Sequence, residues 1–149
     1  MKLHIGIDPG ASGGIAFIPD NNPAKAWSVK MPETLTDLWE CFEDYHGGGE
    51  SWCSVHACLE KVHSMPGQGV ASSFKFGQGF GNLEMALTAA RIPFTYITPQ
   101  KWQRELGCLT GGDKNVSKAR AQQLFPHLRI THALADALLI AEYCRRTNP

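Results

Sequence analysis

Three acidic residues occupy positions from which they could bind a metal ion. Asp8 ends an alternating apolar segment over residues 2–8, and Glu60 ends a second such segment over residues 52–60. Asp136 falls in the first turns of a helix predicted over residues 131–144. If the two segments are neighbouring strands of one sheet, their last carboxylates meet at the same edge, about 5 to 10 Å apart. A helix could add the third carboxylate there.

A cluster of carboxylates stays ionised only when cations neutralise it. Mg²⁺ prefers oxygen ligands, so an all-carboxylate cluster suits it better than zinc. Two such ions about 4 Å apart could activate a water and stabilise the leaving oxygen of a phosphodiester displacement. Each acid also has a structural interpretation, because Asp8 precedes a Pro-Gly turn, Glu60 ends a strand and Asp136 favours a helix N-terminus.

His132 lies four residues before Asp136, so both side chains project from one face of the predicted helix. An imidazole at this position could be a metal ligand, a general acid or the group that handles the attacking water. It could equally help to cap the helix. The pair therefore extends the predicted metal site without fixing the role of the histidine.

The cysteines do not form a recognisable disulfide or zinc pattern. There are five, Cys41, Cys53, Cys58, Cys108 and Cys144, with no repeated spacing. With no export signal recognised, we expect reduced thiols in a cytoplasm. Zinc is the minor alternative, suggested by a segment that contains His46, Cys53, His56, Cys58 and His63. It is disfavoured because no Cys-x2-4-Cys pair is present and strand alternation sends Cys53 and Cys58 to opposite faces.

The charges are unevenly distributed, although 14 basic and 14 acidic residues give a net charge of zero. Residues 1–60 contain three basic and nine acidic side chains, whereas residues 61–129 contain nine basic and three acidic ones. The acid-free stretch from Lys61 to Leu83 also contains Phe74, Phe76 and Phe80. Cations and aromatic rings together are typical of a nucleic-acid surface. The alternative is a solvated helix face with phenylalanines in the core.

The pattern along the chain predicts one α/β domain over residues 1–149 with a mixed sheet. Strands are expected at 2–8, 14–18, 25–30, 52–60 and 93–97, and helices at 32–47, 70–91, 98–106, 117–125 and 131–144. A mobile basic loop is expected over residues 108–116. The late strand-helix-strand succession predicts parallel pairing. No stretch is apolar for long enough to suggest a membrane span.

Several motifs, in this order, resemble the RuvC family of Holliday junction resolvases. They are Gly6 to Gly10 (GIDPG) with Ser12 to Gly14, Leu59 to Val62 (LEKV), Lys75 to Gly81 (KFGQGFG) and Ala135 to Leu138 (ADAL). The chain looks closest to the compact RuvC-like endonucleases often carried by phages. The resemblance implies an RNase H-like fold, with a mixed five-stranded sheet flanked by helices. It also implies a homodimer that nicks paired strands of four-way or other branched DNA, with Mg²⁺ as cofactor and Mn²⁺ as a substitute. A phage enzyme of this kind would work in the host cytoplasm.

The resemblance assigns roles to particular residues. Asp8, Glu60 and Asp136 match the family's catalytic acids, and His132 is given the fourth metal and catalytic position, although many relatives carry that group where this chain has Ala133. Lys118 resembles a lysine that contacts the junction, and a second one falls near Lys101 or, one place away, Trp102. The residues expected to contact DNA are Lys61, His63, Phe74, Lys75, Lys101, Lys114 and Lys118. His63 and Met65 replace the aromatic residue that relatives often have after the glutamate, and the helix at 70–91, with its small glycines, is the expected dimer face.

Two other functions remain open from the sequence. One is a catalytically inactive module that binds branched DNA, favoured by the displaced His132. The other is an actin-like phosphotransferase, suggested by the Asp8 to Gly14 loop. A chain of 149 residues lacks the second lobe with which such enzymes close over ATP, so this alternative ranks last.

Overall fold

A computed structural model describes residues 1–45, 52–63 and 66–148 of the chain. Five strands form one mixed sheet in the order β3-β2-β1-β4-β5. The strands are β1 (Lys2–Asp8), β2 (Gly14–Pro19), β3 (Trp27–Lys30), β4 (Ser54–Glu60) and β5 (Phe94–Ile97). β1 to β3 form an antiparallel meander, whereas β4 and β5 run parallel to β1. The predicted mixed five-stranded sheet is confirmed.

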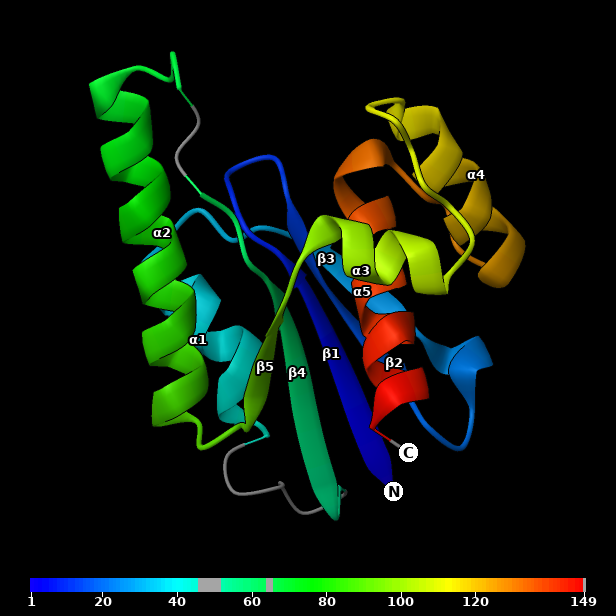
Figure 1. Ribbon diagram of the computed structural model, residues 1–149. Coiled ribbons are helices and arrows are strands. Elements are labelled where there is room, and N and C mark those ends of the chain that lie inside the picture. The colour runs from blue at the N-terminus through cyan, green and yellow to red at the C-terminus, as the bar shows by residue number, and fades with distance from the viewer. Residues whose placement is uncertain (46–51, 64–65, 149) are drawn as a thin grey trace.

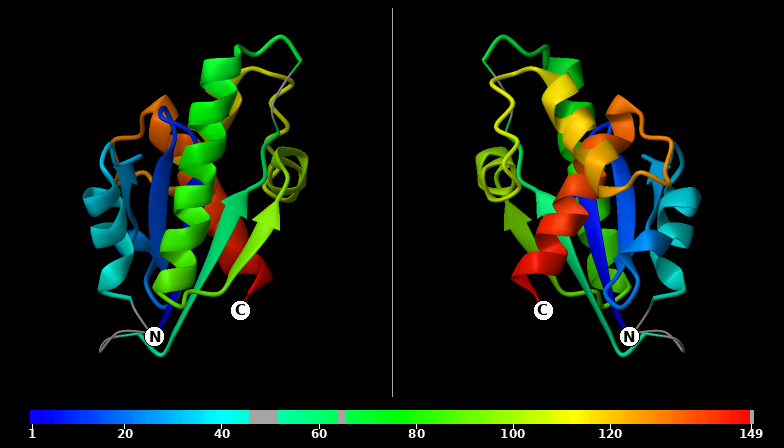
Figure 2. Two further views of the ribbon diagram at one scale, coloured as in Figure 1. Left: turned by 90° about the vertical axis from the view of Figure 1, so that its left-hand side faces the viewer. Right: turned by 90° about the vertical axis from the view of Figure 1, so that its right-hand side faces the viewer.

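The helices cover both faces of this sheet (Figures 1 and 2). They are α1 (Leu35–Glu43), α2 (Val70–Ala89), α3 (Pro99–Glu105), α4 (Lys114–Leu124) and α5 (His132–Thr147), with a short 3₁₀ turn at Pro23–Lys25. α1 and α2 pack on one face through Leu38, Phe42, Leu83 and Leu87. α5 packs on the other face, with α3 and α4 outside it. None of the described helices combines the length and hydropathy that crossing a lipid bilayer requires.

The central strand β1 is buried on both faces from Leu3 to Ile7 because it lies between these two layers. Leu3, Ile5 and Ile7 face α1 and α2 and have no exposed surface. On the other face, α5 crosses β1 at Gly6, where an added Cβ would lie 2.1 Å from the backbone nitrogen of Ala141. A side chain at position 6 would therefore push the helix off the sheet. Gly6, the glycine that begins the GIDPG segment, therefore determines how closely α5 packs against β1.

Several element boundaries differ from those predicted. α4 begins at Lys114 rather than Ser117, because the Asp113 side chain accepts a hydrogen bond from the Asn115 amide at 2.9 Å and caps the helix. Lys114 and Val116 are thus helical, and the predicted loop over 108–116 is shorter. α1 begins after Thr34, which caps it through the Asp37 amide at 3.1 Å. The helix ends at Glu43, earlier than the predicted end near Gly47, which itself lies outside the described residues.

Candidate active site

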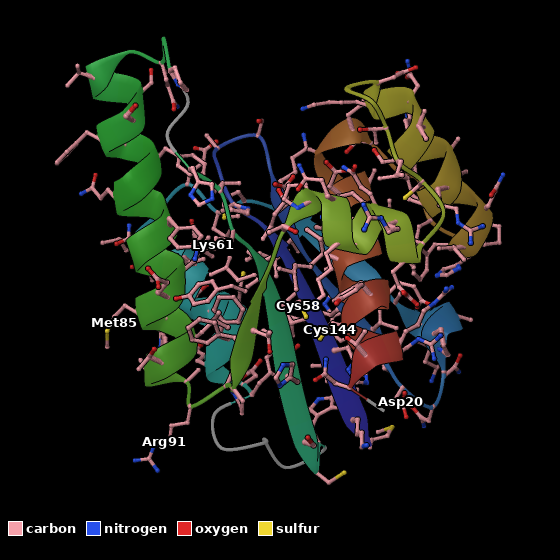
Figure 3. All side chains as sticks on the ribbon, in the orientation of Figure 1. Asp20, Cys58, Lys61, Met85, Arg91 and Cys144 are labelled. Atoms are coloured by element: carbon pink, nitrogen blue, oxygen red, sulfur yellow. The ribbon has the colours of Figure 1, made fainter. Side chains whose placement is uncertain are left out.

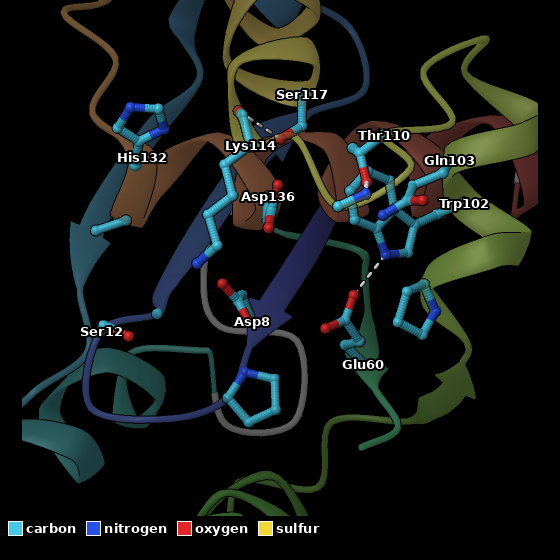
Figure 4. A pocket seen from close by; sticks show the side chains of 15 residues that line it. Asp8, Ser12, Glu60, Trp102, Gln103, Thr110, Lys114, Ser117, His132 and Asp136 are labelled. Carbon is cyan, nitrogen blue, oxygen red and sulfur yellow. Dashed lines mark hydrogen bonds between the residues drawn. The ribbon is translucent and has the colours of Figure 1, made fainter. Parts of the chain in front are cut away.

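The sheet places two of the predicted acids side by side. β1 and β4 are adjacent and parallel, with Ile7 opposite Leu59 in the register, so Asp8 and Glu60 leave the sheet at the same edge. α5 brings Asp136 to this edge from the outer layer. All three side chains line one cavity of about 610 Å³, and Figure 4 shows their carboxylates directed toward a common space.

Asp8 is held by a tight turn between β1 and β2. The Gly13 amide donates to the Gly10 carbonyl at 3.0 Å, and Gly10 has a φ of 108°, in the region that favours glycine. An added Cβ on Gly13 would lie 2.0 Å from the Asp8 carbonyl oxygen and 3.2 Å from its carboxyl carbon. The glycines that follow Asp8 therefore allow the turn to fold back against the carboxylate.

Glu60 is anchored from α3. The indole Nε1 of Trp102 donates a hydrogen bond to Oε2 of Glu60 at 2.6 Å, and Trp102 and Glu60 are only 1% and 8% exposed. One oxygen of the carboxylate is thereby fixed, and the other faces the cavity (Figure 4). Sequence reasoning placed Trp102 only beside a possible DNA-binding lysine, because no local pattern links positions 60 and 102.

Asp136 has a buried oxygen that the chain leaves unused. Within the described residues, its Oδ1 atom is buried and has no hydrogen-bond partner. Buried carboxylate oxygens are almost always hydrogen-bonded, so an unpaired one is an available ligand for a group from outside the chain. α4 lies across from it and contributes Ser117 and Lys114 to the cavity wall.

The environment of the three acids makes the ionised form of each carboxyl group less favourable than in water. Burial, together with Glu60 and Asp136, raises the pKa of Asp8 to about 8, with Lys114 opposing the rise. Burial and Asp136 raise the pKa of Glu60 to about 7 against the Trp102 hydrogen bond. Burial raises the pKa of Asp136, opposed by Ser117, Lys114 and His132. The cations that line the cavity do not offset the burial of these carboxylates, and their all-oxygen donor set fits a hard divalent cation.

Lys114 and His132 also line the cavity. The Lys114 amine points toward Asp8, whereas the His132 ring lies at the rim, well apart from Asp8 and Glu60 in the view of Figure 4. His132 is exposed, and its electrostatic effect reaches Asp136. The structure thus brings all four predicted site residues to one cavity, with the histidine farther from the acids than a shared ligand set suggests.

The other predicted DNA contacts are distributed around this site. Lys118 lies one turn beyond Lys114 and does not line the cavity, so Lys114 is the lysine that α4 presents there. Lys101 is exposed outside the cavity, and its neighbour Trp102 occupies the wall instead. Lys61, His63, Phe74 and Lys75 are exposed between the end of β4 and the first half of α2. His46 and Met65 lie outside the described residues.

Comparisons with known proteins give structural relatives only. No protein-family model matches the chain, and no curated protein matches its sequence. The structure of RuvC from Thermus thermophilus in complex with a Holliday junction substrate superposes with a TM-score of 0.66, at 17% identity, over 99% of this chain and 97% of that one. The chain has a RuvC-like fold. A second Thermus thermophilus RuvC structure gives a TM-score of 0.63 at 18% identity, over 93% and 90% of the two chains.

The fold predicted from the resemblance is therefore confirmed, and the site lies within it. The match to the RuvC fold covers the strands that carry Asp8 and Glu60 and the helix that carries Asp136, because it extends over 99% of the chain. At this level of identity the match establishes architecture. The chemistry must be argued from the cavity itself.

Proposed function

We propose that this chain is a metal-dependent, structure-selective endonuclease that resolves Holliday junctions, and related branched DNA, by nicking paired strands. The convergence of Asp8, Glu60 and Asp136 in one cavity of a RuvC-like fold carries the proposal. The raised pKa values of Asp8 and Glu60 support it, because a cluster built to bind cations repels itself without them.

Asp8, Glu60 and Asp136 would hold Mg²⁺, with Mn²⁺ able to substitute. When bound, divalent cations activate a water and stabilise developing charge at a phosphodiester. The chain's own residues orient the reactants around that centre. Trp102 fixes Glu60, and the positive charge of Lys114 lowers the pKa of Asp8 in part and is positioned to contact a phosphate. His132, exposed at the rim, is suited to proton exchange with the leaving oxygen or with water.

The basic side chains that surround the cavity would hold the DNA backbone. Lys61, His63, Lys75, Lys101, Lys114 and Lys118 supply the cations, and Phe74, which is 73% exposed, supplies an aromatic face. Phosphate contacts of this kind make affinity fall steeply as salt rises, even though the whole chain is neutral.

The active unit would be a homodimer of single domains. α2 presents a stripe of exposed Val70, Phe74, Gly77, Gly81 and Met85 at helical spacing, and an added Cβ on either glycine would meet nothing within 4 Å. Met85 points away from the sheet in Figure 3. A second copy packed on this stripe would place two cavities about a two-fold axis, as paired nicking of a four-way junction requires.

A labelled four-way junction tests this proposal. Purified protein with Mg²⁺ or Mn²⁺ should nick two opposed strands, and linear duplex should survive. Asp8→Asn and Glu60→Gln should reduce nicking to background but leave junction binding in EDTA intact, whereas Glu33→Gln, an exposed acid outside the cavity, should behave as wild type. Binding without nicking in the wild type would instead identify the non-catalytic branched-DNA module.

A further inference from the structure

A second cluster of side chains that could bind a metal lies between the sheet and the C-terminal half of α5, whereas Asp136 lies in the N-terminal half of that helix. His56 and Cys58 are two residues apart on β4, so both point to the face that α5 covers. Cys144, near the end of α5, packs against them. One ligand atom from each of the three lies within 4.8 Å of the others, and Figure 3 shows Cys58 and Cys144 side by side where α5 meets the sheet.

Backbone packing fixes this juxtaposition. Because Gly6 and the neighbouring alanines let α5 sit close to β1, Cys144 reaches across β1 to β4, where its Sγ is 3.6 Å from the His56 carbonyl oxygen. Cys58 is 1% exposed and Cys144 is fully buried. Neither thiol can move far without displacing the helix.

The histidine is oriented as a ligand. His56 Nε2 lies 3.0 Å from the Thr95 hydroxyl on β5. In the tautomer in which Nε2 donates to Thr95, Nδ1 carries the free lone pair, and such a hydrogen bond on the remote ring nitrogen is the usual support for a metal-bound imidazole. His56 is half-buried, so an ion can reach it from outside the core.

A second histidine lies beside His56, although its ring is not among the ligand atoms that lie within 4.8 Å of one another. His4 is the direct neighbour of His56 in the sheet, and the two line a cavity of about 250 Å³ with Asn148 at the end of α5. His4 is 1% exposed, and among the described residues neither ring nitrogen has a hydrogen bond; its Nε2 is 3.5 Å from the Asp20 carboxylate. His4 therefore lines the approach to the cluster, with the Asp20 carboxylate as its own partner.

We propose that His56, Cys58 and Cys144 form a zinc-binding site, with the fourth position open toward the cavity that His4 lines. Thiolates and imidazole select zinc, whereas the all-oxygen cluster at Asp8 suits magnesium, so the two sites take different ions. Binding forms two sulfur–zinc bonds as two thiol protons leave to solvent. The site ties the C-terminal half of α5 to β4 and is independent of the proposed nuclease activity.

Cobalt titration of reduced, metal-free protein in excess Mg²⁺ tests the site. Wild type should take up one equivalent of cobalt with a thiolate-to-cobalt charge-transfer band, which carboxylates cannot produce, and one equivalent of zinc should remove the band. Cys58→Ser and Cys144→Ser should lose it. Cys108→Ser, another buried cysteine outside the cluster, and Asp8→Asn, in the acid cluster, should retain it.

His56→Gln tests the site independently if Cys58→Ser or Cys144→Ser, each of which buries a serine in the core, does not fold. This half-exposed position should tolerate the change, and cobalt affinity should fall at least roughly 10-fold because one ligand of three is lost. Zinc should also raise the melting temperature of wild type more than that of His56→Gln. Absence of the thiolate band in wild type, or equal cobalt affinity in His56→Gln, would overturn the proposed site.

Discussion

Among the described residues, Trp102 is the one whose hydrogen bond holds Glu60 in the cavity. Both side chains are buried, so water does not compete for the carboxylate oxygen that the indole holds. This contact opposes the effect of burial and of Asp136 on the pKa of Glu60. Trp102 is therefore a positioning residue, acting through the acid that it orients.

Trp102→Phe keeps an aromatic ring in the wall but removes the donor. A hydrogen bond to a charged group contributes about 1.5 to 3 kcal/mol, so we expect cleavage near pH 6.5 to fall roughly 10-fold or more. The acid limb of the pH–rate profile should move to higher pH, because the pKa of Glu60 loses a contact that lowers it. A uniform loss of rate with an unmoved profile would show that Trp102 only supports packing.

The raised pKa of Asp8 leads us to expect that the stability of the fold decreases as pH rises. Its pKa rises from the ordinary value of 3.8 to about 8 in the fold, so the folded state binds more protons than the unfolded state between these values. Stability is therefore fully present below about pH 4 and is lost as pH rises through about 8. In EDTA, the melting temperature should fall between pH 5 and pH 8.5.

Asp8→Asn removes the carboxylate whose ionisation destabilises the fold, so its melting temperature should fall less as pH rises. At pH 8.5 it should melt above wild type, by roughly 2 to 4 °C for each kcal/mol of stability gained. Glu33→Gln should follow the wild-type curve. Differential scanning calorimetry across the pH range measures both. Parallel curves for wild type and Asp8→Asn would contradict the electrostatic account.

At the scale of elements, the contact between β1 and α5 determines whether the site assembles. Gly6→Ala would place a methyl group 2.1 Å from a backbone atom of α5, so we expect a loss of roughly 3 kcal/mol or more, measured by urea unfolding. Gly79→Ala, in open space on α2, should instead stabilise the chain by about 0.5 to 1 kcal/mol. A mild effect of Gly6→Ala would mean that α5 can shift without cost.

The elements that the sequence predicted well are those with a local signal. Alternation over 2–8 and 52–60 identified β1 and β4, and both end at the acids they present. The start of α4 was misplaced because Asp113 and Ser117 are both good caps and only the fold selects between them. Lys114 and Lys118 both stay predicted DNA contacts, and of the two it is Lys114 that lines the cavity. Contacts such as Trp102 with Glu60, and Cys144 with Cys58, have no local pattern and appear only once the helices pack.

At the scale of the whole molecule, the stripe on α2 is the proposed contact between two copies. Met85→Glu would bury a charge in that contact, and a buried unpaired charge is costly enough to separate the subunits. We expect a monomer by light scattering, with paired nicking replaced by slow single nicks. Leu35→Glu, an equally exposed leucine on α1, is the matched control and should remain dimeric. Dimers of unchanged affinity in Met85→Glu would remove α2 from the interface.

The support for α2 is uneven along its length. Its buried residues, Leu83, Ala86 and Leu87, all lie in its second half, and the first half extends past the sheet in Figure 1. Amides over residues 70–79 should therefore exchange with deuterium far faster than those over 83–89 in a monomer such as Met85→Glu. Dimerisation or a bound junction should slow the exchange of the first half most. The second half of α2 would then be held on its own sheet at all times, whereas the first half would become rigid only when a second copy or DNA binds it.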